Sequence, residues 1–344
     1  MTLRPDRAYI IAEAGVNHNG SLELARKLVI AALEAGADAV KFQTFKAERV
    51  AQNDAPKAQY QLANTDPVES QIEMLRKLEL SPEAHRELIV LCQESGIDFL
   101  STPYNEEDVE LLDELGIDAF KLASIHAAEP HFLRFVARKK RPIFLATGMA
   151  TLAEVDVAVR AIRGTSDVPL VLLQCTTNYP SRVEDANLRA IATMRAAFDL
   201  PVGYSDHTES DLCCLAAIAL GARVIEKHLT LDKTLPGPDH TSAAEPMEFA
   251  SLVRNVRKAE SALGTGHKEP CEAERANSVN MRRSLAARRL IRAGETITEE
   301  MLTCKRPSSG IAPRLVDEVV GQRAVRDIEA GEPLNWTMVR QTSA

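Results

Sequence analysis

Residues 33–44, LEAGADAVKFQT, decide the fold, because a helical run ends there at Gly36 and an apolar strand run follows at once. The same junction recurs as ESGID around Gly96, ELGID around Gly116 and ALGAR around Gly221. Glycine just after a helix adopts a positive φ without a Cβ clash, so each junction is a clean helix end. The repeated junction predicts helices and strands in alternation.

Working outward from this stretch, we find eight apolar runs that are strand candidates: Tyr9–Ala14, Ala39–Thr44, Asp98–Thr102, Ala119–Ala123, Ile143–Ala146, Leu170–Cys175, Val202–Ser205 and Val224–His228. Strands that alternate with helices pair in parallel, and eight such units predict a closed (β/α)8 TIM barrel, an α/β fold. An open doubly wound sheet is the alternative. It is disfavoured because no GxGxxG turn follows the first strand.

The pattern changes after the predicted barrel, which we place at residues 1–265. Residues 266–283 are polar, contain Pro270 and read as a linker, and residues 284–344 form a compact tail. The tail repeats itself weakly, as IRAGETITEEML at 291–302 and IEAGEPLNWTMV at 328–339. Two AGE turns followed by apolar residues predict a small, β-rich, pseudo-symmetric domain. About sixty residues are marginal for independent stability, so docking on a partner subunit would help.

Composition limits the classes of function. The chain has 344 residues and a formal net charge of -8, which disfavours nonspecific nucleic-acid binding. It contains no apolar run of about 18 residues and no signal-peptide pattern, so we expect no membrane partner. Six cysteines without a CxxC pair favour a reduced, cytoplasmic protein.

Polar residues end or follow every predicted strand. In a barrel these positions share one rim, where active sites of this fold lie. The rim residues are Glu13, Lys41, Gln43, Ser101, Thr102, Lys121, Ser124, Thr147, Asn178, Tyr179, Ser205, His207, Glu226 and His228. This distribution predicts an active site.

Two lysines at matching strand ends, Lys41 and Lys121, indicate an anion such as a phosphate or carboxylate. A lone strand lysine is more often a structural, salt-bridged residue, and that alternative stays open for each of them. Neutral donors that would complete an anion site are Thr102, Ser124, Asn178 and Ser205.

Two histidines, His207 and His228, end neighbouring strands, so their rings would meet above the barrel mouth. Two imidazoles plus waters suit a divalent cation such as Mn2+. The alternative is a pair of hydrogen-bonded histidines without a metal.

Two carboxylates complete the candidate chemistry. Glu13 is a candidate general base or charge stabiliser, or simply the ion-pair partner of Lys41. Asp239, in the turn after the last predicted strand, would accept hydrogen bonds from sugar hydroxyls or would cap the turn.

The segment IAEAGVNHNG at 11–20 resembles the opening signature of the sialic acid synthase family. Further segments resemble the same family in its order: VKFQTF (40–45), LSTP (100–103), FKLAS (120–124), TGMAT (147–151), CTTNYP (175–180), GYSDHT (203–208), EKHLT (226–230) and PGPDH (236–240). The tail, with KRP at 305–307, resembles the SAF (antifreeze-like) domain that follows the barrel in these enzymes. The resemblance covers essentially the whole chain.

The resemblance implies that phosphoenolpyruvate and an N-acetylated hexose condense in the barrel mouth. It makes His207 and His228 ligands of Mn2+, or of another divalent cation such as Mg2+ or Co2+, and it makes Glu13 the carboxylate that helps water add. Residues implied to hold phosphoenolpyruvate are Lys41, Thr102, Lys121, Ser124, Asn178 and Ser205. Residues implied to face the sugar are Gln43, Tyr179 and Asp239, together with Arg306 delivered by the partner in a domain-swapped homodimer.

The sugar is expected to be open-chain N-acetylmannosamine, which with water would give N-acetylneuraminic acid and phosphate. The alternative is 2,4-diacetamido-2,4,6-trideoxymannose, which would give N,N'-diacetyllegionaminic acid. The resemblance places His126 near the sugar, at a position where N-acetylneuraminate synthases have an acidic residue. CTTNYP is one residue shorter than the form in some of those enzymes. A synthase acting on a phosphorylated sugar would need a further basic cluster, which is not evident at the strand ends. A pure binding protein, with the tail as an ice- or glycan-binding module, is the non-enzymatic alternative.

Overall fold

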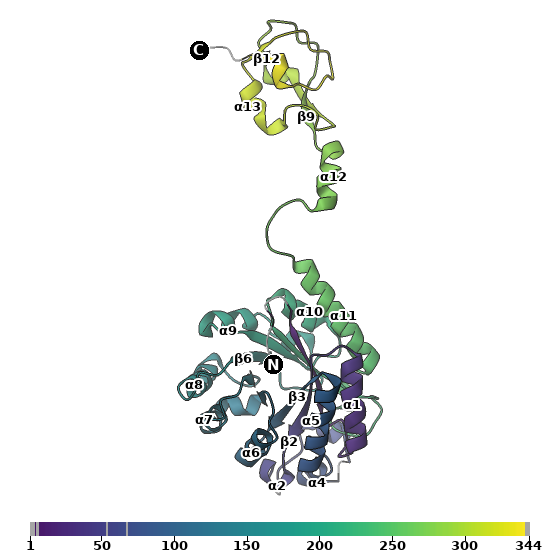
Figure 1. Cartoon of the computed structure of the whole chain (residues 1–344), viewed down its shortest axis with the longest axis vertical. Coiled ribbons are helices and arrows are strands. Elements are labelled where there is room, and N and C mark those ends of the chain that lie inside the picture. Colours follow the sequence, from purple (N-terminus) through teal and green to yellow (C-terminus); the bar gives the residue numbers. More distant parts are fainter. Residues whose placement is uncertain (1–3, 5–6, 53, 67, 341–344) are drawn as a thin grey trace. The chain divides into compact units, whose positions relative to one another are not determined.

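The computed structural model of the chain describes residue 4 and residues 7–52, 54–66 and 68–340. The contacts divide the chain into two compact units, residues 1–264 and residues 265–344 (Figure 1). The division falls one residue from the predicted end of the barrel.

The first unit is a closed, parallel eight-stranded barrel in the order β1 to β8, which confirms the predicted TIM barrel. Register places Glu13 beside both Lys41 of β2 and His228 of β8, so polar residues of three strands meet at one rim. The strands are β1 Tyr9–Gly15, β2 Ala39–Thr44, β3 Asp98–Pro103, β4 Phe120–Leu122, β5 Ile143–Ala146, β6 Leu170–Cys175, β7 Val202–Asp206 and β8 Val224–His228.

Helices surround the barrel in Figure 1. Those that follow the strands are α1 Leu22–Glu34, α5 Pro82–Ser95, α6 Glu106–Glu114, α7 Pro130–Ala137, α8 Leu152–Arg163, α9 Ala190–Phe198, α10 Leu212–Ala219 and α11 Pro246–Leu263. Three short helices lie in the long connection between β2 and α5: α2 Ala47–Val50, α3 Gln59–Asn64 and α4 Gln71–Arg76. The 3-10 turns of this unit are η1 Ser124–Ala128, η2 Val183–Asp185 and η3 His240–Ser242.

Local sequence explains where these helices start and stop. The Ser81 hydroxyl accepts a hydrogen bond from the Ala84 N–H at the start of α5, and Pro82 stands at the first helical position. The same helix ends at Gly96, which adopts φ +75°. Thr151 and Glu154 form the capping box that begins α8.

The interior of the barrel is apolar below its polar rim. Inward-facing Tyr9, Ile11, Leu100, Phe144 and Leu173 belong to one buried cluster, in which Tyr9 and Phe144 stack at 5.9 Å. A larger cluster fills the layer between the strands and the helices. Side chains therefore fill the interior of the barrel, and in this fold the site lies at the C-terminal ends of the strands.

The second unit contains two small antiparallel sheets, as the repeated AGE turns predicted. Ile291 and Ile328, which start the two repeats, exchange backbone hydrogen bonds of 3.0 and 2.9 Å. Its elements are α12 Glu272–Met281, β9 Ser284–Ala287, η4 Glu299–Met301, β10 Leu302–Lys305, η5 Pro313–Leu315, α13 Val316–Val319, β11 Arg323–Ala324, η6 Trp336–Met338 and β12 Val339–Arg340. Helix α12 lies within the stretch read as a linker and buries none of its residues.

Within the described part of the chain, no helix has the length and apolar character needed to cross a membrane.

Candidate active site

A cavity of about 520 Å3 lies at the C-terminal ends of the barrel strands. It is lined by residues of all eight βα junctions, as the rim argument predicted. The predicted site residues that line it are Glu13, Lys41, Gln43, Thr102, Lys121, Ser124, Asn178, Tyr179, Ser205, His207, His228 and Asp239.

A buried network of two acids and two bases forms the floor of the cavity. Lys41 Nζ lies 2.6 Å from Glu13 Oε2 and donates to the Thr102 hydroxyl at 3.2 Å. Lys121 Nζ lies 3.2 Å from Glu226 Oε1, and the same oxygen accepts from the Ser205 hydroxyl at 2.9 Å. Lys41 is therefore both an ion-paired strand residue and part of the cavity wall, so the two interpretations of it are compatible.

Glu226 was named from the sequence only as one of the rim residues and received no role of its own, although it lies at the centre of this network. Its Oε2 is buried without a hydrogen bond and lies 4.0 Å from Lys41 Nζ. Val224, Glu226 and His228 alternate along β8, which points all three into the barrel. This period-two alternation is the signal that would have shown that Glu226 points inward.

The network separates the proton affinities of its two carboxyl groups. Burial alone would raise the pKa of Glu226, but Lys121 and Lys41 outweigh it and lower that pKa to about 2. Burial raises the pKa of Glu13, and Glu226 adds to this against the opposing effect of Lys41. Glu226 is thus a fixed negative charge, whereas Glu13 is the carboxyl group suited to exchanging a proton.

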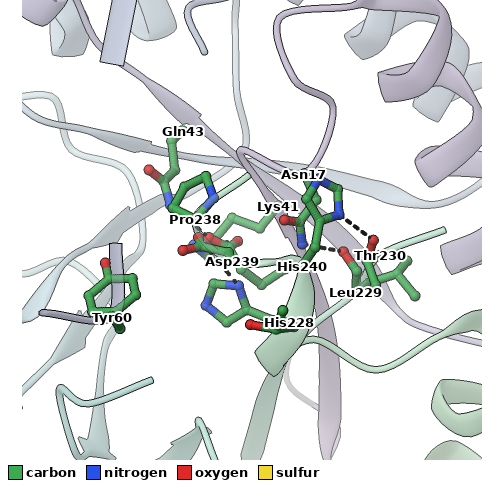
Figure 2. Close-up of polar contacts among 12 residues, drawn as sticks. Asn17, Lys41, Gln43, Tyr60, His228, Leu229, Thr230, Pro238, Asp239 and His240 are labelled. Carbon is green, nitrogen blue, oxygen red and sulfur yellow. Dashed lines mark hydrogen bonds and ion pairs between the residues drawn. The ribbon is translucent and has the colours of Figure 1, made fainter. Parts of the chain in front are cut away.

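The two predicted metal ligands lie together. The rings of His207 and His228 are 5.5 Å apart between centroids. His207 Nδ1 donates to the Thr176 carbonyl at 2.7 Å, so the lone pair on Nε2 is available to bind a metal ion. His228 Nδ1 is buried without a hydrogen bond and lies 3.8 Å from Asp239 Oδ2 (Figure 2).

These donors fit a divalent cation bound by two imidazoles, with oxygen atoms of water or substrate in the remaining positions. Among the described residues, no three or more His, Cys, Asp or Glu side chains gather in a ready-made metal site.

The predicted sugar side of the cavity is aromatic as well as polar. Gln43 Nε2 donates to Glu13 Oε1 at 3.3 Å, and Tyr104 OH donates to Gln43 Oε1 at 3.2 Å. The ring of Tyr179 lies 4.1 Å from that of His207 and 5.0 Å from that of Tyr60 on α3. Tyr60 and Tyr104 were not predicted, because the chain brings them in from the β2–α5 connection and from the residue just after β3.

Asp239 is held in place by the turn around it. The Asn19 side-chain amide donates to the Pro236 carbonyl at 2.9 Å, and the Asn64 side chain donates to the Pro238 carbonyl at 3.2 Å. Figure 2 shows Asp239 between Gln43 and His228, with Tyr60 across from it. Burial first, and Glu13 second, raise the pKa of Asp239 to about 6.

The second residue of the TGMAT segment, Gly148, has no room for a side chain. Its N–H donates to the Ser124 hydroxyl at 3.0 Å, which orients that hydroxyl at the cavity wall. A Cβ at this position would lie 2.3 Å from Thr177 Oγ1 and 2.8 Å from Ser124 Oγ. Any side chain would therefore displace the hydroxyls beside the site.

One predicted sugar-side residue of the barrel, His126, does not line the cavity. His126 is buried behind it, with Nδ1 2.8 Å from a Glu129 carboxylate oxygen and Nε2 3.2 Å from the Pro103 carbonyl oxygen. Its ring packs on Phe132 at 4.4 Å. Arg306 belongs to the second unit, is exposed, and donates from Nε to the Met281 carbonyl at 3.0 Å.

Comparison with known proteins places this site in a family. The NeuB family model matches residues 28–268, and the SAF domain model matches residues 282–340. The N,N'-diacetyllegionaminic acid synthase of Legionella pneumophila is 45% identical over 95% of this chain and 93% of its own length. The synthase of the same name from Campylobacter jejuni is 44% identical over 95% of this chain and 98% of its own length.

Two further relatives carry the names of other products. A pseudaminic acid synthase of Campylobacter jejuni is 37% identical over 95% of each chain. The crystal structure of the N-acetylneuraminic acid synthetase of Leptospira borgpetersenii matches with a TM-score of 0.71 and 33% identity, over 79% of this chain and 90% of that one. With a TIM barrel, a SAF domain and a rim of the predicted residues, the chain belongs to the NeuB family of phosphoenolpyruvate-dependent synthases of acidic sugars.

Proposed function

We propose that this enzyme condenses phosphoenolpyruvate with open-chain 2,4-diacetamido-2,4,6-trideoxymannose and water, giving N,N'-diacetyllegionaminic acid and phosphate. The observation that carries this choice is the identity of 44–45% to two legionaminic acid synthases from different genera, against 37% to a pseudaminic acid synthase. These relatives favour the diacetamido trideoxy sugar as substrate. N-acetylmannosamine was the first expectation from the sequence.

The buried floor supports binding of phosphoenolpyruvate. Lys41 and Lys121 would face its phosphate and carboxylate, with the hydroxyls of Thr102, Ser124 and Ser205 beside them. Glu226 holds both ammonium groups in place before the substrate arrives. Preorganised charges of this kind stabilise the transition state without reorganising during the reaction.

The reaction proposed for this cavity has three balanced steps. C3 of phosphoenolpyruvate attacks the sugar aldehyde carbon, which leaves a cationic C2. Glu13 accepts a proton from the water whose oxygen bonds to C2, and its raised pKa suits that role. The resulting intermediate loses phosphate by cleavage of the bond between C2 and the bridging oxygen, while the C2 hydroxyl gives its proton to the leaving phosphate, which forms the keto acid. The proton held by Glu13 passes to the former aldehyde oxygen, which becomes a hydroxyl.

His207 and His228 would hold a divalent cation such as Mn2+, which would supply positive charge where the aldehyde oxygen becomes an alkoxide. Asp239 and Gln43 would receive the sugar hydroxyls beside it, and the ring of Tyr179 would pack on the sugar.

The test of the reaction is phosphate release from phosphoenolpyruvate that carries 18O in its bridging C–O–P position. With Mn2+ and the diacetamido sugar, the label should leave in the phosphate. The Glu13→Gln variant should still bind phosphoenolpyruvate but lose about 100-fold or more in turnover. Label found in the sugar product, or full turnover by Glu13→Gln, would reject these steps.

A further inference from the structure

One wall of the cavity is apolar, in contrast to its charged floor. Val16 follows β1, Phe45 follows β2, Met74 lies on α4 and Leu78 follows α4. These four residues, here called the apolar wall, form a buried hydrophobic cluster distinct from the barrel core. All four also line the cavity that holds Glu13, Lys41 and the two histidines.

The apolar wall adjoins the sugar side of the cavity. The ring of Tyr104 meets Phe45 edge to face at 5.7 Å, and its hydroxyl donates to Gln43 Oε1 at 3.2 Å. Gln43 in turn contacts Glu13. The apolar wall therefore adjoins the residues proposed to bind the sugar. Lys121 and Glu226 belong to the part of the cavity proposed to bind phosphoenolpyruvate.

The two candidate sugars differ in the groups that an apolar surface would contact. A hydroxyl placed against it would lose its hydrogen bonds to water without a replacement, whereas a methyl group would gain apolar contact. N-acetylmannosamine carries hydroxyls at C4 and C6. The diacetamido trideoxy sugar carries an acetyl methyl on its C4 substituent and a methyl group at C6.

We infer that the apolar wall is the subsite for the C6 methyl group and the C4 acetyl methyl group of the sugar, and that Met74 and Leu78 determine specificity for a deoxygenated, doubly acetylated substrate. This inference rests on the proposed function. The competing interpretation is that the wall only packs the β2–α5 connection, in which case its polarity affects stability but not the choice of sugar.

The experiment compares Met74→Gln, Leu78→Gln and Met74→Leu with the wild-type enzyme. Ile72→Gln is the matched control, because Ile72 is buried on the same helix α4 but does not line the cavity. Phosphate release gives kcat/KM for N-acetylmannosamine, for 2-acetamido-2,6-dideoxymannose and for the diacetamido trideoxy sugar. The middle compound isolates the effect of the C6 methyl group.

We expect each glutamine variant of the wall to lower the preference for the diacetamido sugar over N-acetylmannosamine by about 10-fold or more, the scale of apolar-pocket discrimination. Met74→Leu and Ile72→Gln should keep the wild-type preference within about twofold. If a glutamine variant does not fold, Met74→Ala removes the same contact without adding polarity and should lower the preference similarly.

The outcomes separate the two proposals. A wild-type preference that survives Met74→Gln, Met74→Ala and Leu78→Gln would overturn the wall as a specificity subsite and leave the proposed function standing. A wild-type enzyme that prefers N-acetylmannosamine would overturn the proposed function itself, whatever the variants do.

Discussion

At the scale of single residues, Glu226 provides a negative charge beside buried lysines before the substrate binds. It pairs with Lys121 at 3.2 Å and lies 4.0 Å from Lys41, and removing one partner of a buried ion pair leaves an uncompensated charge in a medium of low dielectric constant. Phosphoenolpyruvate brings its own negative charge, so the bound state needs Glu226 less than the empty state does.

We therefore expect Glu226→Gln to lower the free energy of unfolding of the unliganded enzyme by about 3 kcal/mol. The same substitution should enlarge the rise in melting temperature that phosphoenolpyruvate produces, because the ligand then supplies the missing counter-charge. Thermal unfolding with and without phosphoenolpyruvate measures both effects. An equal loss of stability in the two conditions would contradict this role.

The buried His18 should make the folded protein less stable at acid pH. Burial, with a smaller effect of His85, lowers the pKa of His18 to about 4. Below pH 6.5 the unfolded chain gains a proton at this position and the folded chain does not until about pH 4. Stability should therefore fall by about 3 kcal/mol at this residue as pH falls from 6.5 to 4.

His18→Asn keeps an acceptor for the Gly20 N–H, which now donates to His18 Nδ1 at 3.0 Å. The variant should flatten the dependence of unfolding free energy on pH between 4 and 6.5, as measured by urea unfolding at several pH values. An unchanged slope would show that other groups dominate acid unfolding.

At the scale of elements, the junction after β7 is held from behind the barrel. Lys227 Nζ, buried, lies 2.7 Å from Asp206 Oδ2 and donates to the Thr208 carbonyl at 2.6 Å. Asp206 Oδ1 accepts from the Thr208 N–H at 2.9 Å. His207 lies between these two residues, so this clamp sets the position of a proposed metal ligand.

Lys227→Met is expected to cost about 3 kcal/mol of stability and to weaken Mn2+ binding about 10-fold to 100-fold, as losses of supporting contacts around a metal do. Urea unfolding and the electron paramagnetic resonance signal of free Mn2+ measure these two quantities. Lys27→Met, which removes the exposed ion pair with Glu23, is the control and should change neither. Wild-type Mn2+ affinity in a folded Lys227→Met enzyme would refute the clamp.

The sequence predicted the barrel well because its strands and helix ends depend on local rules. Gly36 and Gly96 stop helices wherever they occur, and alternation in β2 turns Lys41 inward. Helix α4 was not predicted, although Ser70 and Glu73 form the capping box that starts it. Helix α12 was also not predicted. It has no apolar face, so its polar composition is the same as that of a linker.

The site was predictable as a rim but not as a network. Neighbouring strands brought Glu13, Lys41 and His228 together as register requires. Tyr60 and Tyr104 enter the cavity from connections whose paths depend on tertiary packing, which no local pattern encodes. His126 adjoins a strand end but turns away, because Glu129 and the Pro103 carbonyl satisfy both of its ring nitrogens.

At the scale of the whole molecule, the remaining proposal is that two chains share their sites. The barrel supplies Glu13, and we propose that Arg306 of the second unit reaches the sugar site of a partner in a homodimer. Neither Glu13→Gln nor Arg306→Ala alone should then be fully active. A mixed dimer of the two variants would contain one site with both residues intact.

Refolding an equal mixture of these two variants should give about a quarter of wild-type activity above the residual activity of each, because about half of the dimers are mixed and each mixed dimer has one intact site. Steady-state phosphate release on the refolded mixture is the measurement, and each variant refolded alone is the control. No recovery, with dimers shown by sedimentation, would mean that Arg306 does not act across subunits.

A competition between the two sugars in one reaction decides which of them the enzyme uses. The enzyme receives phosphoenolpyruvate, Mn2+ and equal amounts of N-acetylmannosamine and the diacetamido trideoxy sugar, and mass spectrometry identifies the acidic sugars formed. The account predicts N,N'-diacetyllegionaminic acid as the dominant product, with one phosphate released per molecule. N-acetylneuraminic acid as the dominant product would contradict it.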